Sequence, residues 1–385
     1  MHRALWISEV IGEICNHLDE DSLTKLARTC RTIYPAALDS LWEELDDFRP
    51  VVCCLPDDFW VENDEGIFIN RNGLTNEDWE IAAKYTTRVR TLSCYLDSTV
   101  NEAELIAFAK MAIYSHENHG TPLFPSLKTL HWCDDHPEYF PLFSIAGASL
   151  VDLKIAFTPR SCLDTALFLG GLGSMFPHLK NLQINGLEWK PNSCVALSQG
   201  LRHLRWLEVF RCSTLDESAW LNLGQLPNLA EIDVYLSDYA LQQLKSLTNT
   251  HHPRLFTNLR YIRLDVNDLK LVTEFLELLQ VSPVSLDIRL HQHTTMETIV
   301  CFMLSLSRCC KHNILQALSI RACPFKNGAD DATLEFIHPL FCFRNLRKLE
   351  LHFPYELSAS DVLIQKMTNA WPELQHLELP KACRY

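Results

Sequence analysis

Three short runs of histidine and cysteine are the residues of this 385-residue chain that most resemble metal ligands. They are His291-x-His293, Cys309-Cys310-x-His312 and Cys133-x-x-His136. A structural zinc site needs four nitrogen or sulfur ligands, which usually come as two short pairs. Because none of the three runs has a matching second pair, we expect neither a metal nor a cofactor.

Two carboxylates, Glu208 and Asp233, could act as a general acid and base if neighbouring strands brought them to about 4.8 Å. That chemistry needs a desolvated cleft, and the adjoining Arg263 would keep Asp233 ionised. The sequence also lacks G-x-x-x-x-G-K-[ST], G-x-G-x-x-G and G-x-S-x-G, the motifs of nucleotide-binding loops and serine hydrolases. We therefore interpret Glu208, Asp233, Arg263 and Asp287 as a surface charge ladder, and we expect a protein that is not an enzyme.

The elements that position these residues come from a six-residue phrase with Leu or Ile at most of its first, fourth and sixth positions. Its eleven copies start at Val89, Leu127, Leu150, Leu179, Leu204, Leu229, Leu259, Pro283, Leu315, Leu346 and Leu374. Their fourth residues run from Leu92 to Leu377, 285 residues over ten intervals, which is a mean period of 28.5 residues. The pattern resembles a leucine-rich repeat. We predict an α/β solenoid, a horseshoe with a parallel sheet on its concave face and helices on its convex face.

The repeat pattern also predicts smaller features. It places Cys212 and Cys323 at the ninth position, where leucine-rich repeats carry a buried Asn or Cys. Asp216, and Ser358 or Ser360, precede segments with helical spacing and are expected to cap those helices.

The third, fifth and seventh residues of each phrase are predicted to point onto the concave surface, which such repeats commonly use for binding. Interface hot spots are rich in Trp, Tyr and Arg. The predicted binding patch for a protein target consists of Trp206, Glu208, Phe210, Asp233, Tyr235, Tyr261 and Arg263. The alternative is that a neighbouring loop covers these aromatic side chains.

Residues 1–48 contain no such phrase and carry apolar residues at helical spacing. We predict three short helices there, a linker or N-terminal cap over residues 49–86, and the solenoid over residues 87–385. A unit this small cannot bury all of its large apolar side chains, so some of them are expected to contact a partner. The predicted partner-binding residues are Val10, Ile14, Leu18, Leu23, Leu26, Ala27, Cys30, Leu41 and Trp42. The alternative is that they pack on the first repeat.

The segment ALWISEVIGEICNHLDEDSLTKLARTCRTIYPAALDSLWEEL, residues 4–45, resembles the F-box. The positions that carry the resemblance are Glu9-Val10, Ile14, Leu18, Ser22-Leu23, Thr29-Cys30-Arg31 and Leu41-Trp42. Ile7 and Ser8 stand where F-boxes usually have prolines. The continuations PVVCCLPDDFW and EDWEIAAKYTTRVRTL are similar to the large fungal family of F-box proteins with degenerate leucine-rich repeats.

This resemblance implies a substrate adaptor of an SCF cullin-type ubiquitin ligase, acting in ubiquitin-dependent protein degradation. The F-box would dock onto a Skp-family adaptor, and through it a cullin, while the repeats would bind a protein target. The alternative is a leucine-rich-repeat scaffold that binds a partner without any ligase, with the helices serving only as an N-terminal cap.

Composition limits which partners and which cellular compartment we expect. The 48 acidic residues outnumber 34 basic ones, for a net charge of -14, which disfavours nucleic acid as a partner. Glu9 and Glu13 interrupt the first apolar stretch, so no secretory signal is expected, and no apolar window reaches the ~20 residues needed to span a bilayer. The fifteen cysteines then indicate reduced thiols. We expect an intracellular protein of the cytoplasm or nucleus that binds neither nucleic acid nor membrane.

Overall fold

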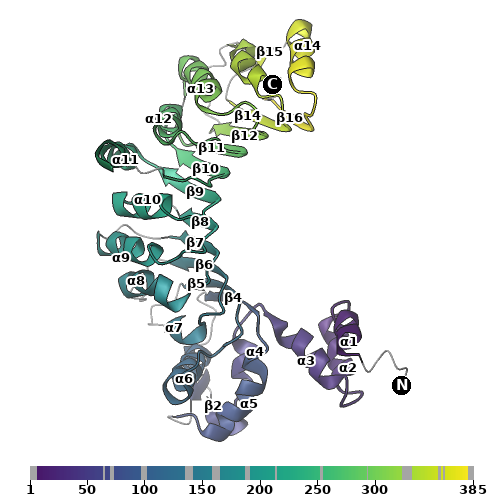
Figure 1. Ribbon diagram of the computed structural model, residues 1–385. Helices are drawn as coiled ribbons and strands as arrows, with labels where there is room; N and C mark the ends of the chain where they lie inside the picture. Colours follow the sequence, from purple (N-terminus) through teal and green to yellow (C-terminus); the bar gives the residue numbers. More distant parts are fainter. Residues whose placement is uncertain are drawn as a thin grey trace. The chain divides into compact units, whose positions relative to one another are not determined.

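The computed structural model describes residues 7–63, 66–69, 73–96, 102–134, 142–157, 165–186, 191–212, 215–251, 255–292, 294–322, 332–353, 357–358 and 360–379. The chain divides into two compact units, Met1–Glu188 and Trp189–Tyr385. Within each unit, parallel strands alternate with helices (Figure 1). The predicted α/β class is therefore confirmed, and the boundary between the units falls inside the predicted solenoid.

The first unit begins with the three expected helices, α1 (Ser8–Cys15), α2 (Glu20–Ala27) and α3 (Tyr34–Glu43). We call them the helical module. Asp19 caps α2, since its side chain accepts a hydrogen bond of 2.8 Å from the Ser22 amide. The three helices enclose a small core made of Ile11, Cys15, Leu23, Ala27, Ile33 and Ala37. The end of α3 leads directly into β1 (Glu44–Leu45), which pairs with β4 (Thr91–Leu96).

Regular structure also occupies much of residues 49–86, the predicted linker or cap. It comprises α4 (Arg49–Val52), η2 (Asp57–Phe59), an antiparallel hairpin of β2 (Trp60–Asn63) and β3 (Gly66–Ile69), and α5 (Asn76–Thr86). A reciprocal capping box between Thr75 and Asp78 starts α5. Phe59 is buried. Phe48, just before α4, is also buried, and its ring centroid lies 4.8 Å from that of Phe108 on α6 (Glu102–His119). The region therefore packs into the core of the first unit.

The remaining elements of the first unit repeat a strand and a helix. They are α6 (Glu102–His119), β5 (Thr129–Asp134), α7 (Leu142–Ile145), β6 (Asp152–Phe157), α8 (Thr165–Met175) and β7 (Asn181–Asn185). The strand order is β1-β4-β5-β6-β7, and every neighbouring pair is parallel. The first four phrases fall on β4 to β7, and their fourth and sixth residues are buried as predicted, for example Leu153 and Ile155 of β6.

The second unit continues the same alternation at greater length. Its elements are α9 (Pro191–Leu201), β8 (Val209–Cys212), α10 (Glu217–Gly224), β9 (Glu231–Leu236), α11 (Asp238–His251), β10 (Tyr261–Val266), α12 (Leu269–Leu279), β11 (Ser285–Leu290), α13 (Met296–Cys309), β12 (Ala317–Ala322), β13 (Ala332–Thr333), η3 (Leu334–Cys342), β14 (Lys348–His352), β15 (Leu357–Ser358), α14 (Asp361–Ala370) and β16 (His376–Glu378). Asp216 caps α10 and Ser360 caps α14, as expected.

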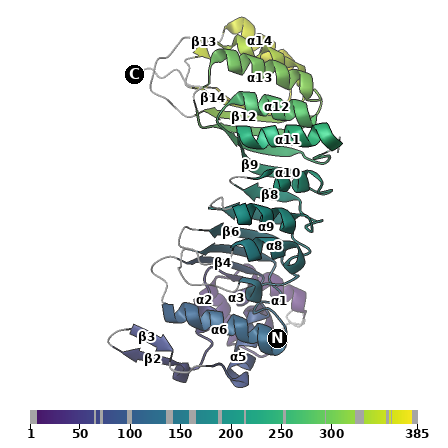
Figure 2. The same ribbon diagram turned by 90° about the vertical axis from the view of Figure 1, so that its left-hand side faces the viewer.

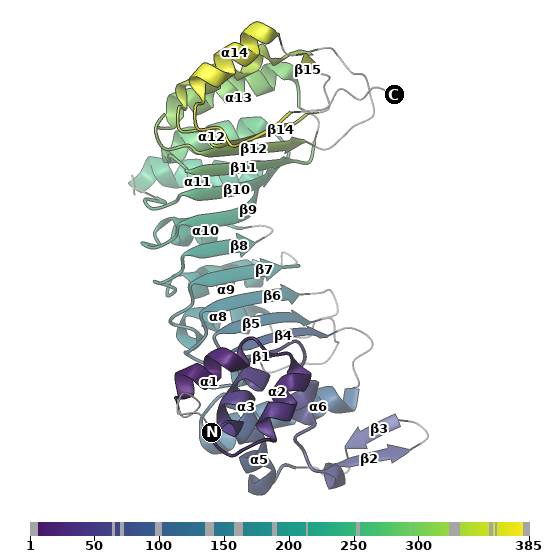
Figure 3. The same cartoon turned by 90° about the vertical axis from the view of Figure 1, so that its right-hand side faces the viewer.

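The main sheet of the second unit has the order β8-β9-β10-β11-β12-β14-β16, and all its neighbouring pairs are parallel. In this unit the helices cover one face of the sheet (Figure 2), and the opposite face, seen in Figure 3, carries the third, fifth and seventh residues of the phrases. We call this opposite face the strand face.

One phrase is shifted by three residues from its predicted position. Phe210 of β8 pairs with Ile232 of β9, so Phe210, and not Leu207, is the fourth residue of that copy. Phe210 and Cys212 are consequently buried core residues of the strand. Cys212 is a sixth-position residue and not the predicted ninth-position cap, while Cys323 lies outside the described residues.

The shift has a simple physical reason. The sequence LRWLEVFRC contains two overlapping windows with apolar residues at positions 1, 4 and 6, one starting at Leu204 and the other at Leu207. The second window buries the whole Phe210 ring, a larger apolar surface than the Val209 side chain that the first would bury. Packing therefore selects the later register.

Candidate binding surfaces

Helix α1 carries apolar side chains on two faces. Ile11 and Cys15 point into the core of the helical module and are buried. Val10 and Ile14 remain 36% and 40% exposed, and Ile7, just before the helix, is also exposed. Residues three and four positions apart share one side of a helix, so these three side chains form a single row, which we call the α1 stripe (Ile7, Val10 and Ile14). The module closes its own core without them.

The other predicted partner-binding residues differ in burial. Leu23 and Ala27 are buried in the module core, so the expectation that they contact a partner is corrected: they hold the three helices together. Helical spacing alone does not say which of two apolar faces is the inner one. The partly exposed members that pack against the same core are Leu18, Leu26, Cys30 and Leu41.

Trp42, the last residue of the predicted set, contacts the rest of the first unit. Its ring centroid lies 4.7 Å from that of Tyr85 on α5. Arg88, just after α5, also pairs with Asp39 of α3. These contacts attach the helical module to α5, which lies before the first phrase.

The strand face of the second unit brings together the predicted charged residues. Asp233, Arg263 and Asp287 occupy paired positions on β9, β10 and β11. Arg263 donates from Nη1 to Asp233 Oδ2 over 3.1 Å and from Nε to Asp287 Oδ2 over 2.9 Å. Asp287 also accepts a hydrogen bond of 2.6 Å from Arg321 of β12. The predicted charge ladder is confirmed for these three positions.

The shifted register changes the first residue of the predicted charge ladder. Arg211, and not Glu208, pairs with Asp233, and it donates to Glu231 over 2.7 Å. Glu208 lies just before β8. We define the strand-face ladder as Arg211, Asp233, Arg263, Asp287 and Arg321.

The predicted aromatic patch is only partly assembled. Tyr261 is 46% exposed at the start of β10, and the hydroxyl of the half-buried Tyr235 accepts a hydrogen bond of 2.8 Å from Asn267. Phe210 is buried in the core. Trp206 is 54% exposed, but it lies in the turn before β8 and not on a strand. Of the seven predicted residues, the strand face therefore gathers Asp233, Tyr235, Tyr261 and Arg263.

The arginines of the ladder lower the pKa of Asp287. Burial by itself raises the pKa of Asp287, but the hydrogen bonds and positive charges of Arg321 and Arg263 outweigh burial, so the pKa lies below its usual value. Asp265 lies two residues after Arg263 on β10. Burial raises the pKa of Asp265, and the charge of Arg289 offsets only part of that increase. Arg263 thus lies between Asp233 and Asp287 in the ladder.

Replacing Asp287 with Ala is expected to lower the free energy of unfolding by about 2 kcal/mol, because Arg263 and Arg321 lose the carboxylate that they share. Since folding lowers the pKa of Asp287, this contribution is present above about pH 4 and is lost as the pH falls through the folded-state pKa. Urea unfolding near neutral pH and at about pH 3 measures both effects. Glu373→Ala is the control, because its ion pair with Arg347 is half exposed and contributes about 0.5 kcal/mol or less. Equal losses in the two variants would contradict the prediction.

The cysteine and histidine runs do not assemble a metal site where they are described. Burial raises the pKa of Cys310 to about 12, and its Sγ lies 3.8 Å from the Val281 carbonyl oxygen. His312 instead lies 2.8 Å from the Ser307 carbonyl oxygen. His293 and His136, which complete the other two runs, lie outside the described residues.

Comparisons with known proteins give a similarity to solved structures only. No family model matches the sequence, and no curated protein matches it. The crystal structure of a TLR13–ssRNA13 complex is similar at 14% identity and a TM-score of 0.38, over 76% of this chain and 39% of that one. Its matched portion is thus well under half of the TLR13 chain. In the described ranges, no helix combines the length and apolar character needed to cross a membrane.

The observed elements define the class of protein. The phrases fall on parallel strands in register in both units, and each of these strands from β4 to β14 is followed along the chain by a helical segment. Their leucines, isoleucines and equivalents fill the core. The chain is an α/β protein built from leucine-rich repeats of a strand and a helix, and three helices precede its first strand, β1.

Proposed function

We propose that the chain is the substrate receptor of an SCF-type ubiquitin ligase, in which the helical module docks onto a Skp-family adaptor. The observation that carries this proposal is the α1 stripe, because it leaves three apolar side chains exposed on a module whose core is already closed. Burying apolar surface contributes roughly 25 cal/mol per Å². An amphipathic helix that enters a groove on a partner is a common mode of recognition. The F-box resemblance of residues 4–45 supports a Skp-family adaptor as this partner.

The strand face of the second unit is the proposed binding surface for the protein target. Leucine-rich repeats commonly bind through this face. The ladder presents partly exposed arginines, such as Arg211 and Arg321, on the face that also carries the exposed Tyr261. Charges arranged in this way favour a partner with complementary charge and discriminate against others. Such a receptor acts inside the cell, in the cytoplasm, the nucleus or both.

The test is capture of a purified Skp-family adaptor by the full-length chain. The double variant Val10→Asp, Ile14→Asp is expected to weaken capture at least about 100-fold, because it places two charges in a contact that must lose water. Its matched control is Val362→Asp, Ile364→Asp, an exposed apolar pair on α14. Both pairs are exposed, so both variants should keep the far-ultraviolet circular dichroism of the parent chain. Equal capture by the two double variants would overturn the proposal.

A second candidate function, a leucine-rich-repeat scaffold without a ligase, has its own supporting observation. The contact of Trp42 with Tyr85, and the pairing of β1 with β4, are the contacts expected of an N-terminal cap. If the intact chain fails to capture the adaptor, this second function takes precedence.

A further inference from the structure

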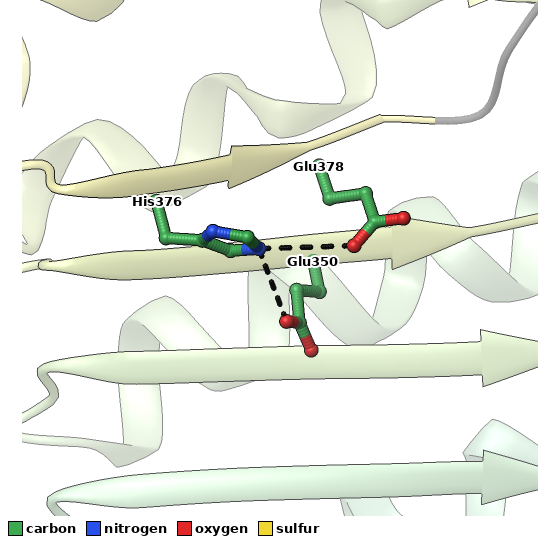
Figure 4. A group of neighbouring side chains, drawn as sticks. All are labelled: Glu350, His376 and Glu378. Atoms are coloured by element: carbon green, nitrogen blue, oxygen red, sulfur yellow. Dashed lines mark ion pairs between the residues drawn. The ribbon is translucent and has the colours of Figure 1, made fainter.

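Three side chains of metal-ligating type meet at the C-terminal end of the strand face (Figure 4). Glu350 lies on β14, and His376 and Glu378 lie on β16, where Glu378 pairs in register with Glu350. His376 Nε2 lies 3.2 Å from Glu350 Oε1 and 3.7 Å from Glu378 Oε2. In the described part of the chain, this is the one group of three or more His, Cys, Asp and Glu residues whose ligand atoms all lie within 4.8 Å of one another.

The distances fit ligands of a single ion. Two ligands of a tetrahedral zinc ion with bonds of about 2.0–2.1 Å are separated by about 3.3 Å. The separations of 3.2 Å and 3.7 Å lie on either side of that value. A distance of 3.7 Å is too long for a hydrogen bond between His376 and Glu378. Two carboxylates directly opposite each other on neighbouring strands also repel, and a cation between them removes that repulsion.

A second imidazole lies near one member of the group only. His352 of β14 places its Nε2 3.7 Å from Glu378 Oε2, but it does not belong to the group whose ligand atoms all lie within 4.8 Å of one another. The set is therefore one imidazole and two carboxylates, all of them on the strand face. Nitrogen and carboxylate oxygen ligands suit zinc, whereas calcium and magnesium prefer sites made of oxygen alone.

The carboxylate of Glu350 also has a lysine neighbour on its own strand. Lys348 Nζ lies 2.7 Å from Glu350 Oε1. It is therefore the cation with which a metal ion competes.

We propose that Glu350, His376 and Glu378 bind one zinc ion, with water as the fourth ligand, and that this ion fastens β16 to the sheet. β16 has three residues, all exposed, and it pairs with β14 along one edge only among the described strands. Leu377, between the two ligands of β16, remains 44% exposed. Since little burial holds this strand, an ion shared with β14 adds the missing attachment.

The test is a zinc titration of the full-length chain by calorimetry, with His376→Ala and Glu350→Gln as site variants. The control is His131→Ala, since His131 also lies on a strand, 3.9 Å from Asp152, but outside any such group. The parent chain, the two site variants and His131→Ala have the same cysteines, so zinc binding to thiols is common to all four. We expect one binding event that the two site variants lose and His131→Ala keeps. Lys348→Met should tighten it about tenfold, because the competing charge is gone.

Amide hydrogen exchange tests whether the bound zinc ion also fastens β16. Zinc should slow exchange at residues 376–378 in the parent chain and in His131→Ala, but not in the site variants. A titration that is the same in His376→Ala and in the parent chain would overturn the site. Binding that leaves exchange at residues 376–378 unchanged would overturn the fastening of β16. Neither result depends on adaptor binding.

Discussion

Trp220→Ala is expected to lower the free energy of unfolding of the second unit by about 4 kcal/mol. Trp220 lies on α10 and is completely buried. Its ring meets Phe256 at 6.1 Å and Phe275 at 5.8 Å between centroids, both edge to face. Phe256 precedes β10 and Phe275 lies on α12, so one side chain links successive repeats. Because each repeat is stabilised by its neighbours, a cavity at this contact weakens several repeats together.

Urea unfolding followed by circular dichroism measures this effect, with Trp206→Ala as the matched control. Trp206 is exposed in a turn, so its truncation should change the free energy of unfolding by about 0.5 kcal/mol or less. Trp220→Phe should cost much less than Trp220→Ala, because it keeps a ring and removes a buried Nε1 that has no hydrogen-bond partner among the described residues. Comparable losses from the two tryptophan-to-alanine variants would show that Trp220 does not carry the packing assigned to it.

Gly186→Ala is expected to destabilise the first unit by about 3 kcal/mol or more. Gly186 follows β7 with a φ of +66°, in the left-handed region. A Cβ atom there would lie 1.9 Å from the carbonyl oxygen of Phe157, at the end of β6. Because the obstacle is backbone, it cannot rotate away, and the ends of two neighbouring strands must separate.

Gly120→Ala provides a direct comparison for this prediction. Gly120 has nearly the same φ, +64°, but no atom lies within 4 Å of its added Cβ. Gly120→Ala should therefore lower the free energy of unfolding only by the backbone strain, about 1–2 kcal/mol. Thermal or urea unfolding of both variants isolates the contribution of the close approach to Phe157. If Gly120→Ala loses as much stability as Gly186→Ala, the contact at Phe157 is not the cause.

The candidate surfaces were predicted from the sequence with unequal success. Position five of the phrase correctly placed Asp233, Arg263 and Asp287 side by side, because the strands stack in phase. The same rule chose Glu208 where the structure has Arg211, since LRWLEVFRC allows two registers. In the helical module, spacing found the apolar residues but not their direction. The packing of three helices decided that Leu23 faces inward while Val10 and Ile14 face solvent.

The group at β14 and β16 could not be found from local motifs. Glu350 and His376 are 26 positions apart, and neither belongs to a paired Cys or His run. An alignment of the last two phrases, LRKLEL and LQHLEL, places Glu350 and Glu378 at the same position and His376 two residues earlier. That alignment contains the signal, but it acquires meaning only once the strands are known to be neighbours.

The sequence by itself determined the α/β class, the strand positions for most phrases, and three N-terminal helices. It did so because alternating apolar residues every second position, and apolar rows at helical spacing, are local properties of the chain. Only the tertiary structure decided the register of β8, the outward row of α1 and the meeting of Glu350 with His376 and Glu378. Each of these depends on which segments pack against each other, and packing chooses between local patterns that the sequence satisfies equally well.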